Sequence, residues 1–308
     1  MAHYITDAYG NLIKVAGNYS PMSMSNPNLL INGDFRVNQR GQTSYTVDNK
    51  YTVDRWLNRE TSMSVTPLTN GGIKLERTAT AVTAVPMISQ SLEMFENLLG
   101  KTLTLTIKVS EDNTVNGFEF GVWGGTQARY ATKDYGSSVY LKGTGIHTVT
   151  LTLPTIVDYE RLNVCIRLKQ DSSQGENIVV DWIKLENGSI TTPFNPRLYG
   201  EELTLCQRYY YMTSFNINAS AASSTTQLYP EVFLPTSFRA KPTVNCSTGF
   251  SIRGAGVEVE SGVTNITVNT AWANTNFVKL LVTTTKSMTK FQCYSCHNGT
   301  LEFDAEIY

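Results

Sequence analysis

The sequence is poor in charge, in long apolar runs and in paired cysteines, and each shortage excludes a class of protein. Charged residues make up 17% of the 308 residues, and the formal net charge is −1. This charge balance gives no reason to expect that the chain as a whole binds nucleic acid or an anionic membrane. No apolar run approaches the roughly 20 residues of a membrane helix, and the polar opening MAHYITDAYG does not resemble a signal peptide. We expect no membrane insertion, and we expect synthesis in the cytoplasm.

The five cysteines are odd in number and scattered, which argues against a disulfide framework. The stretch CYSCH at 293–297 matches a haem-attachment pattern, a redox pair or half of a zinc site. A zinc site needs two further ligands, and the other cysteines and histidines form no second pair. The stretch also has strand character, which would turn Cys293 and Cys296 to opposite faces. We expect ordinary core and turn cysteines; a trimer axis that joins copies of Cys296 or His297 is the remaining alternative.

Short strand-like segments are what the sequence has in abundance. Residues 101–110 alternate Leu103, Leu105, Ile107 and Val109 with polar residues, as a half-buried strand does. Similar segments recur about every ten residues between turn signals, a pattern typical of an all-β sandwich.

Local signals add turns and one interruption to this pattern. Asn32-Gly33 predicts a tight turn between short strands at 29–31 and 35–37, because both residues tolerate positive φ. Residues 88–99 predict a strand-to-helix passage that Gly100 closes. Near the N-terminus, Tyr4–Ala8 and Leu12–Ala16 predict a small hairpin around Tyr9-Gly10, which would need a partner surface.

Within residues 191–211 the spacing of the apolar residues changes from strand-like to helix-like. Pro193 and Pro196 end an incoming strand, because proline fixes φ and lacks an amide donor. Apolar residues at 203, 206 and 209 or 210 then have helical spacing. We expect a short helix here, followed by a second β-rich region with turn signals at Gly254 and Gly256.

Two distant stretches together resemble a known family. The opening NLLINGDFRVNQRG (28–41) with YTVDRW (51–56), and the closing VVDWIKLENGSITTPFNPRLYGEELTLCQRYY (179–210), are similar to bacteriophage tail-fibre and receptor-binding proteins. The C-terminal region resembles them only through FLPTSFRAKPTV (233–244). The resemblance implies a jelly-roll domain like a carbohydrate-binding module, a small C-terminal β domain, a homotrimer, and a virion tail protein that contacts the host surface.

The resemblance divides the chain into four regions. We expect an arm at 1–27 that attaches to another tail or baseplate protein, the jelly-roll at 28–196, a linker helix at 197–211, and a C-terminal β-sandwich at 212–308 as the tip that binds the receptor. Leu203, Cys206, Tyr209 and Tyr210 should pack on the C-terminal domain or on neighbouring subunits, near a three-fold axis.

Acidic residues at the two ends of the first module raise the question of a metal. Asp34 and Asp181 could meet if the first and last strands pair, and jelly-roll carbohydrate modules often clamp these strands with calcium. A capping hydrogen bond, or an ion pair with Arg36 or Arg55, explains them more simply, since calcium wants several hard oxygen ligands. We also expect Trp56 and Trp182 to be buried indoles, with the charges of Asp54, Arg55 and Asp181 at strand edges.

No motif supports an enzyme. The acidic residues have no spacing that favours a glycosidase pair, no G-x-S-x-G elbow is present, and GVWGGTQ at 121–127 lacks the lysine and the helix of a phosphate loop.

Sugar binding needs aromatic faces flanked by hydrogen-bonding side chains. Core packing is the simpler explanation for any single aromatic residue. Two loop-rich stretches nonetheless combine both kinds of residue: Trp123, Gln127, Arg129, Tyr130, Asp134, Tyr135 and Tyr140 in the first module, and Trp272, Asn274, Asn276 and Phe277 in a connection that we expect to be distal.

These observations predict a non-enzymatic tail protein that adheres to host surface carbohydrate, without a cofactor unless calcium is bound. Two alternatives stay open: a purely structural fibre, baseplate or head decoration component, and a polysaccharide depolymerase.

Overall fold

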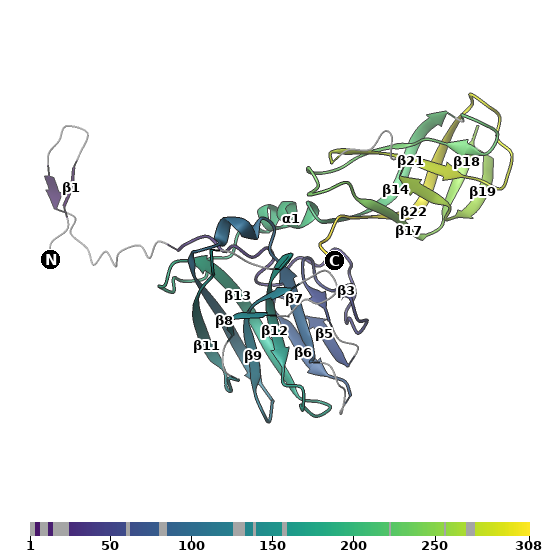
Figure 1. Ribbon diagram of the computed structural model, residues 1–308. Coiled ribbons are helices and arrows are strands. Elements are labelled where there is room, and N and C mark those ends of the chain that lie inside the picture. The colour runs from purple at the N-terminus through teal and green to yellow at the C-terminus, as the bar shows by residue number, and fades with distance from the viewer. Residues whose placement is uncertain are drawn as a thin grey trace.

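The computed structural model describes residues 4–6, 12–14, 25–59, 62–79, 85–125, 133–137, 140–155, 159–221, 223–255, 257–268 and 275–308. These residues confirm an all-β fold: two sandwiches of antiparallel sheets, with the helix α1 (Tyr199–Gln207) between them (Figure 1). Among the described residues, no helix has the length and apolar character needed to cross a membrane.

The first sandwich consists of a six-stranded and a five-stranded sheet. In spatial order, the six-stranded sheet contains β10 (Lys133–Ser137), β9 (Phe118–Gly125), β12 (Arg161–Leu168), β7 (Met87–Ser91), β4 (Leu57–Asn58) and β3 (Lys50–Tyr51). The five-stranded sheet contains β11 (Gly145–Thr152), β8 (Thr102–Asp112), β13 (Asn177–Asn187), β6 (Ile73–Arg77) and β5 (Met63–Pro67).

The core of the first sandwich lies between these sheets. On β8, Leu103, Leu105, Ile107 and Val109 all belong to the buried cluster, as predicted, but Thr104 and Thr106 are buried as well, so the strand is not the half-buried one expected. On the other face of β8, threonines pair with those of β11, for example Thr102 with Thr152 at 3.0 Å between hydroxyl oxygens. The strand therefore has one apolar face and one face of mainly hydroxyl side chains, as period-two patterning requires.

The passage predicted at 88–99 is also confirmed: β7 leads into a 3-10 helix, η1 (Phe95–Leu98), and Gly100 follows at φ 70°. The turn at Asn32-Gly33 forms, with Asn32 at φ 55°. The short strands predicted on either side of that turn are wrong. The backbone there bonds instead to β13, since Leu29 N donates to Leu185 O and Ile183 N to Gly33 O.

The N-terminal hairpin is confirmed as a pairing of β1 (Tyr4–Thr6) with β2 (Leu12–Lys14), with Ile5 opposite Ile13. Its predicted turn at Tyr9-Gly10 lies outside the described residues.

The second sandwich also consists of two sheets. One contains β14 (Tyr210–Ala221), β22 (Cys293–Asp304), β18 (Phe250–Gly254) and β19 (Val257–Val263), with β17 (Thr243–Thr248) paired to β22. The other contains β15 (Gln227–Leu228), β21 (Phe277–Thr283) and β16 (Glu231–Phe233), with β20 (Ile266–Val268) paired to β21. Figure 1 shows that the chain ends back at the first sandwich, near β3.

Candidate functional site

The helix α1 packs mainly on the first sandwich. Glu202, buried on α1, accepts a hydrogen bond of 2.6 Å from the backbone N of Asn32, and Arg197 forms an ion pair with Glu202 at 3.1 Å. The hydroxyl of Tyr209 bonds to Glu93, which precedes η1. Of the residues expected to pack on the C-terminal domain or on neighbouring subunits, Tyr209 thus contacts the first sandwich through Glu93, whereas Tyr210 pairs with Asp304 of β22 in the second sandwich. Packing against a neighbouring subunit near a three-fold axis stays a prediction.

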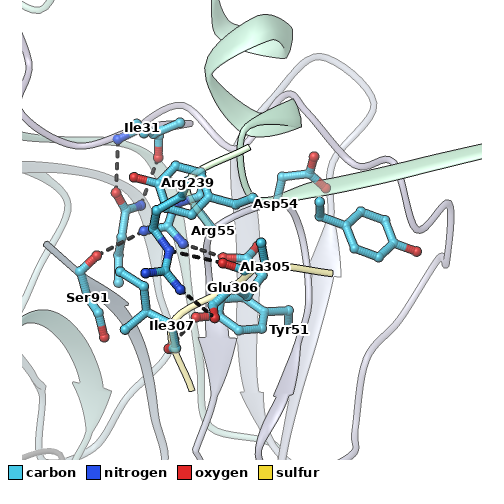
Figure 2. Close-up of polar contacts among 12 residues, drawn as sticks. Ile31, Tyr51, Asp54, Arg55, Ser91, Arg239, Ala305, Glu306 and Ile307 are labelled. Atoms are coloured by element: carbon cyan, nitrogen blue, oxygen red, sulfur yellow. Dashed lines mark hydrogen bonds and ion pairs between the residues drawn. The ribbon is translucent and has the colours of Figure 1, made fainter. Parts of the chain in front are cut away.

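A group of charged side chains joins the two sandwiches. Arg55 of the first sandwich forms a buried ion pair with Glu306, which follows β22, and also donates to Ser91 O at 2.9 Å (Figure 2). Arg40 lies 3.5 Å from Asp54 and 3.7 Å from Glu306. The side chains of Asp54 and Glu306 have no exposed surface. The charges of Asp54 and Arg55 are thus buried, and not at a strand edge as expected, because a second sandwich covers them.

Aromatic rings complete this contact. The guanidinium carbon of Arg40 lies 3.7 Å from the ring centre of Tyr210, and that of Arg55 lies 3.6 Å from Tyr209. At such distances the ring faces attract the cations. Tyr209 lies between α1 and β14 and Tyr210 begins β14, and each ring thus contacts an arginine of the first sandwich.

The C-terminal residues extend the contact. The hydroxyl of Tyr51 donates to Ile307 O at 2.6 Å, and its ring meets that of Tyr308 edge to face, with ring centres 5.2 Å apart. Arg239 donates to Ala305 O at 3.0 Å, as Figure 2 shows, and its backbone N bonds to Arg208 O. The last residues of the chain are therefore clamped between β3, the linker and residue 239.

A pocket of about 300 Å³ opens beside this clamp, and we call it the inter-sandwich pocket. Its volume is at the lower end of the range of small-ligand sites. Its wall from the first sandwich is Arg40, Gln42, Tyr45, Thr46, Val47, Lys50 and Tyr51. Its wall from the second sandwich is Tyr210, Thr243, Asn245, Glu302, Asp304 and Tyr308.

The walls carry polar groups that a ligand can reach. Four of the lining side chains form no hydrogen bond or ion pair within the described part of the chain: Gln42, Lys50, Asn245 and Glu302. Tyr308 is 44% exposed and offers an aromatic surface beside them. An aromatic surface with nearby amide, ammonium and carboxylate groups is suited to a polyhydroxylated ligand.

A second, smaller pocket of about 150 Å³ lies near residues 25–28 and 194–197 and differs in this respect. Its polar side chains already serve the fold. Asn28 bonds to the backbone of Ile183 and Leu185, and Arg197 bonds to Leu30 O and to Glu202. We therefore place the candidate site in the inter-sandwich pocket.

Burial changes the acidity of several groups at this contact. Burial raises the pKa of Asp54 to about 6, although Arg40 and Gln39 oppose the rise. Burial lowers the pKa of Arg40, but the carboxylates of Glu306 and Asp54 outweigh it and the net pKa is raised. Burial also raises the pKa of Tyr51 and Tyr210. Asp54 is thus the group here that titrates in a mildly acidic range.

The structure describes only part of the site predicted in the middle of the first module. Trp123 is 3% exposed, packed with Met87 and Cys165, and its ring lies 4.7 Å from the guanidinium carbon of Arg167. It is closed to a ligand. Tyr135 is half-buried and packs against Tyr159 with ring centres 4.8 Å apart. Gln127, Arg129 and Tyr130 lie outside the described residues.

The second predicted site is also incompletely described, since Trp272 and Asn274 lie outside the described residues. Asn276 is exposed. The backbone O of the preceding residue, Thr275, accepts a hydrogen bond from Phe238 N. The residue after Phe238, Arg239, donates its backbone N to Arg208 O in the linker. Whether this connection is distal in an assembly stays a prediction. Phe233, 78% exposed, pairs with Phe277 at the same end, with ring centres 6.0 Å apart.

Asp34 and Asp181 form ion pairs with different basic side chains. Asp34 forms an ion pair with Arg36, as the simpler explanation predicts, and Asp181 forms one with Lys108 at 2.9 Å. The described residues contain no group of three or more metal-ligating side chains, and calcium stays a prediction. Trp182 is half-exposed and stacks on Phe194 at 4.7 Å, so the prediction of a buried indole is wrong there and right for Trp56.

The cysteine prediction is confirmed on β22. Cys293 is exposed and Cys296 is buried, as opposite faces of a strand require. All five thiols are free.

No protein family model matches the chain, and no curated protein shows significant sequence similarity to it. Among solved structures, the chain resembles the tandem CBM22 modules at the N-terminus of Xyn10C from Paenibacillus barcinonensis, with 9% identity, a TM-score of 0.33, and coverage of 94% of this chain and 100% of that one. A Stig cyclase, Fisc from Fischerella sp. TAU, gives 15% identity and a TM-score of 0.35 over 54% of this chain and 100% of the cyclase. The tandem CBM51 modules of Sp3GH98 from Streptococcus pneumoniae give 10% identity and a TM-score of 0.23 over 77% and 84%. Likenesses this distant carry no function with them.

Proposed function

We propose that this chain is a non-enzymatic, glycan-binding protein of a bacteriophage tail, and that it binds sugar in the inter-sandwich pocket. The observation that carries the proposal is the pocket itself: the side chains of Gln42, Lys50, Asn245 and Glu302 face it without an internal partner among the described residues, beside the exposed ring of Tyr308. The resemblance of the two distant motifs to tail-fibre proteins supports the setting.

The chemistry of the walls suits a sugar. Amide and carboxylate groups form hydrogen bonds with hydroxyls, and a tyrosine ring packs against the apolar face of a pyranose. Because the ring of Tyr308 is held edge to face by Tyr51, a ligand meets it already ordered, which lowers the entropic cost of binding.

In this proposal each region has a role. Residues 1–27 attach the chain to another tail or baseplate protein, 28–196 form a carbohydrate-module-like domain, 197–211 connect, and 212–308 form the receptor-binding domain. Three chains form a homotrimer. Three weak sugar sites on one trimer gain avidity without any new contact.

The test is adsorption of the full-length protein to a glycan array and to host cells, compared with Asn245→Ala and Tyr308→Ala. We expect each variant to lose tenfold or more in apparent affinity. Asn187→Ala, on an exposed residue at the end of β13, serves as the matched control and should bind as the wild type does. Unchanged binding by both pocket variants would refute the pocket as the site.

Two further measurements separate the alternatives. No adsorption by the whole protein favours a purely structural virion component. New reducing ends after incubation with host polysaccharide would identify a depolymerase. For the assembly, a sedimentation mass of one subunit contradicts the homotrimer.

A further inference from the structure

The negative charges at the inter-sandwich pocket are distributed unevenly. Glu302 and Asp304 lie two residues apart on β22, so both side chains point to the same face of the sheet. Both line the pocket and both are half-buried. Asp304 accepts hydrogen bonds from the hydroxyl of Tyr308 at 2.5 Å and from Glu306 N at 2.8 Å. Glu302 lines the pocket, and its carboxylate has no such partners in the described part of the chain.

The positive charges nearby are largely used elsewhere. Arg40 is shared between Asp54 and Glu306 and lies over the ring of Tyr210. Arg55, one layer deeper, is paired with Glu306. Lys50 is the cation that lines the pocket without a described partner, and it is exposed at the outer rim. A salt-screened rim charge acts weakly, whereas a half-buried carboxylate acts through a medium of lower dielectric constant.

Tyr210, which also lines the pocket, lies near charges of both signs. Burial is the largest cause of the raised pKa of Tyr210, Arg40 opposes it, and the carboxylates of Glu302, Asp54 and Asp304 add to it. The carboxylates that add to this rise, Glu302 among them, also disfavour an anion brought into the pocket, whereas Arg40 favours it.

We infer that the inter-sandwich pocket selects sugars that carry no negative charge, and that Glu302 is the residue that excludes sugar acids. This inference rests on the proposed glycan binding and names its ligand class. A neutral hydroxyl or a protonated amine donates a hydrogen bond to the Glu302 carboxylate. A uronic acid brings a second carboxylate against it, and like charges in a half-buried site are a device for rejecting the wrong ligand.

The experiment uses a glycan array in which each hexose is present in three matched forms: glucose, glucosamine and glucuronic acid, and galactose, galactosamine and galacturonic acid. For wild-type protein we expect the acid forms to bind at least tenfold more weakly than the neutral and amine forms. Glu302→Gln should narrow this difference about tenfold. Glu231→Gln, on a half-exposed carboxylate of β16 that pairs with Lys279, should leave it unchanged.

A second measurement needs no variant. Because salt screens repulsion, the affinity of wild-type protein for the acid forms should rise between 50 mM and 500 mM NaCl relative to that for the neutral forms. If the acid forms bind as strongly as the neutral forms or more strongly, and Asn245→Ala abolishes this binding, the charge selection is wrong and the proposed function still stands. No binding of any form, or binding that ignores Asn245→Ala and Tyr308→Ala, would overturn both.

Discussion

Arg55 and Glu306 are separated by 251 residues in the sequence and form a buried ion pair between the two sandwiches. Neither side chain reaches solvent to any useful extent, with exposures of 1% and 0%. Loss of one partner therefore leaves a buried charge that water does not solvate. Such a loss is costly even where the intact pair contributes little net stability.

Replacement of Arg55 by Met should lower the free energy of unfolding by about 3 kcal/mol or more. The reason is the uncompensated carboxylate of Glu306, which among the described residues then keeps Arg40 at 3.7 Å as its ion-pair partner. Urea denaturation followed by tryptophan fluorescence gives the value. The double variant Arg55→Met/Glu306→Met should recover at least half of the loss.

The matched control for this prediction is the ion pair of Lys279 with Glu231, whose atoms lie 3.2 Å apart and whose side chains are 27% and 48% exposed. Lys279→Met should cost no more than about 1 kcal/mol, as is usual for exposed pairs. Equal losses for Arg55→Met and Lys279→Met would contradict the role of burial.

Asp54 should give the protein a specific pH dependence. Its pKa is about 6 in the folded protein against an ordinary value of 3.8, so the folded state binds more protons between these values. The stability that protonated Asp54 contributes is present below about pH 4 and is lost as the pH rises through about 6. This difference corresponds to about 3 kcal/mol.

Asp54→Asn removes this titration. The free energy of unfolding of the variant, measured relative to wild type, should therefore rise by about 3 kcal/mol between pH 4 and pH 7. The control Asp171→Asn, on a side chain that is 61% exposed, should show a flat difference over the same range. A flat difference for Asp54→Asn would mean that the carboxylate stays ionised when buried.

Replacement of Asn32 should lower the free energy of unfolding by much more than its positive φ alone explains. Its side chain bonds to Val37 N at 2.9 Å, Val37 O at 2.8 Å and Asp54 O at 2.9 Å. Asn32→Ala leaves these buried backbone groups unpaired, and we expect a loss of about 4 kcal/mol in the free energy of unfolding.

Asn298 provides the comparison, because it has a similar φ of 63° but is exposed. Asn298→Ala should cost about 1 kcal/mol, the strain of a left-handed conformation at a residue with a Cβ. Thermal melting and urea unfolding of both variants measure the difference. A loss at Asn32 no larger than that at Asn298 would contradict the hydrogen-bonding role.

Thiol reagents should modify one cysteine of the five in the native protein. Cys293 is exposed and the other four are buried. Burial raises the pKa of both Cys165 and Cys296 to about 12, which leaves almost no reactive thiolate at pH 8. Mass spectrometry after iodoacetamide treatment should show one adduct, none in Cys293→Ser, and five in urea. Two adducts in the native protein would contradict the placement of Cys296.

The parts of the fold that could be predicted are those written in local patterns. The alternation at 101–110, the passage at 88–99 and the helical spacing after Pro196 each depend on neighbouring residues, and each occurs near its predicted position. The strands around Asn32-Gly33 failed because the β13 backbone, about 150 residues away, competes for the same hydrogen bonds.

The candidate site could not be predicted, for the same reason on a larger scale. Its two walls come from residues 40–51 and from residues 210–308, and only the docking of the sandwiches brings them together. Tyr51 and Tyr308 look like ordinary surface or core tyrosines until Ile307 is placed beside them. Trp123 illustrates the converse: a tryptophan next to loop-rich sequence is closed by packing under Arg167.

The clamp on the end of the chain has a practical consequence for chimeric proteins. A crossover in the linker near residue 197 would join a foreign C-terminal half to a first sandwich whose Arg40, Tyr51 and Arg55 are shaped for Tyr210, Ile307 and Glu306. An exchange of C-terminal halves between related proteins should therefore preserve glycan binding only when the residues on both sides of each contact are exchanged together.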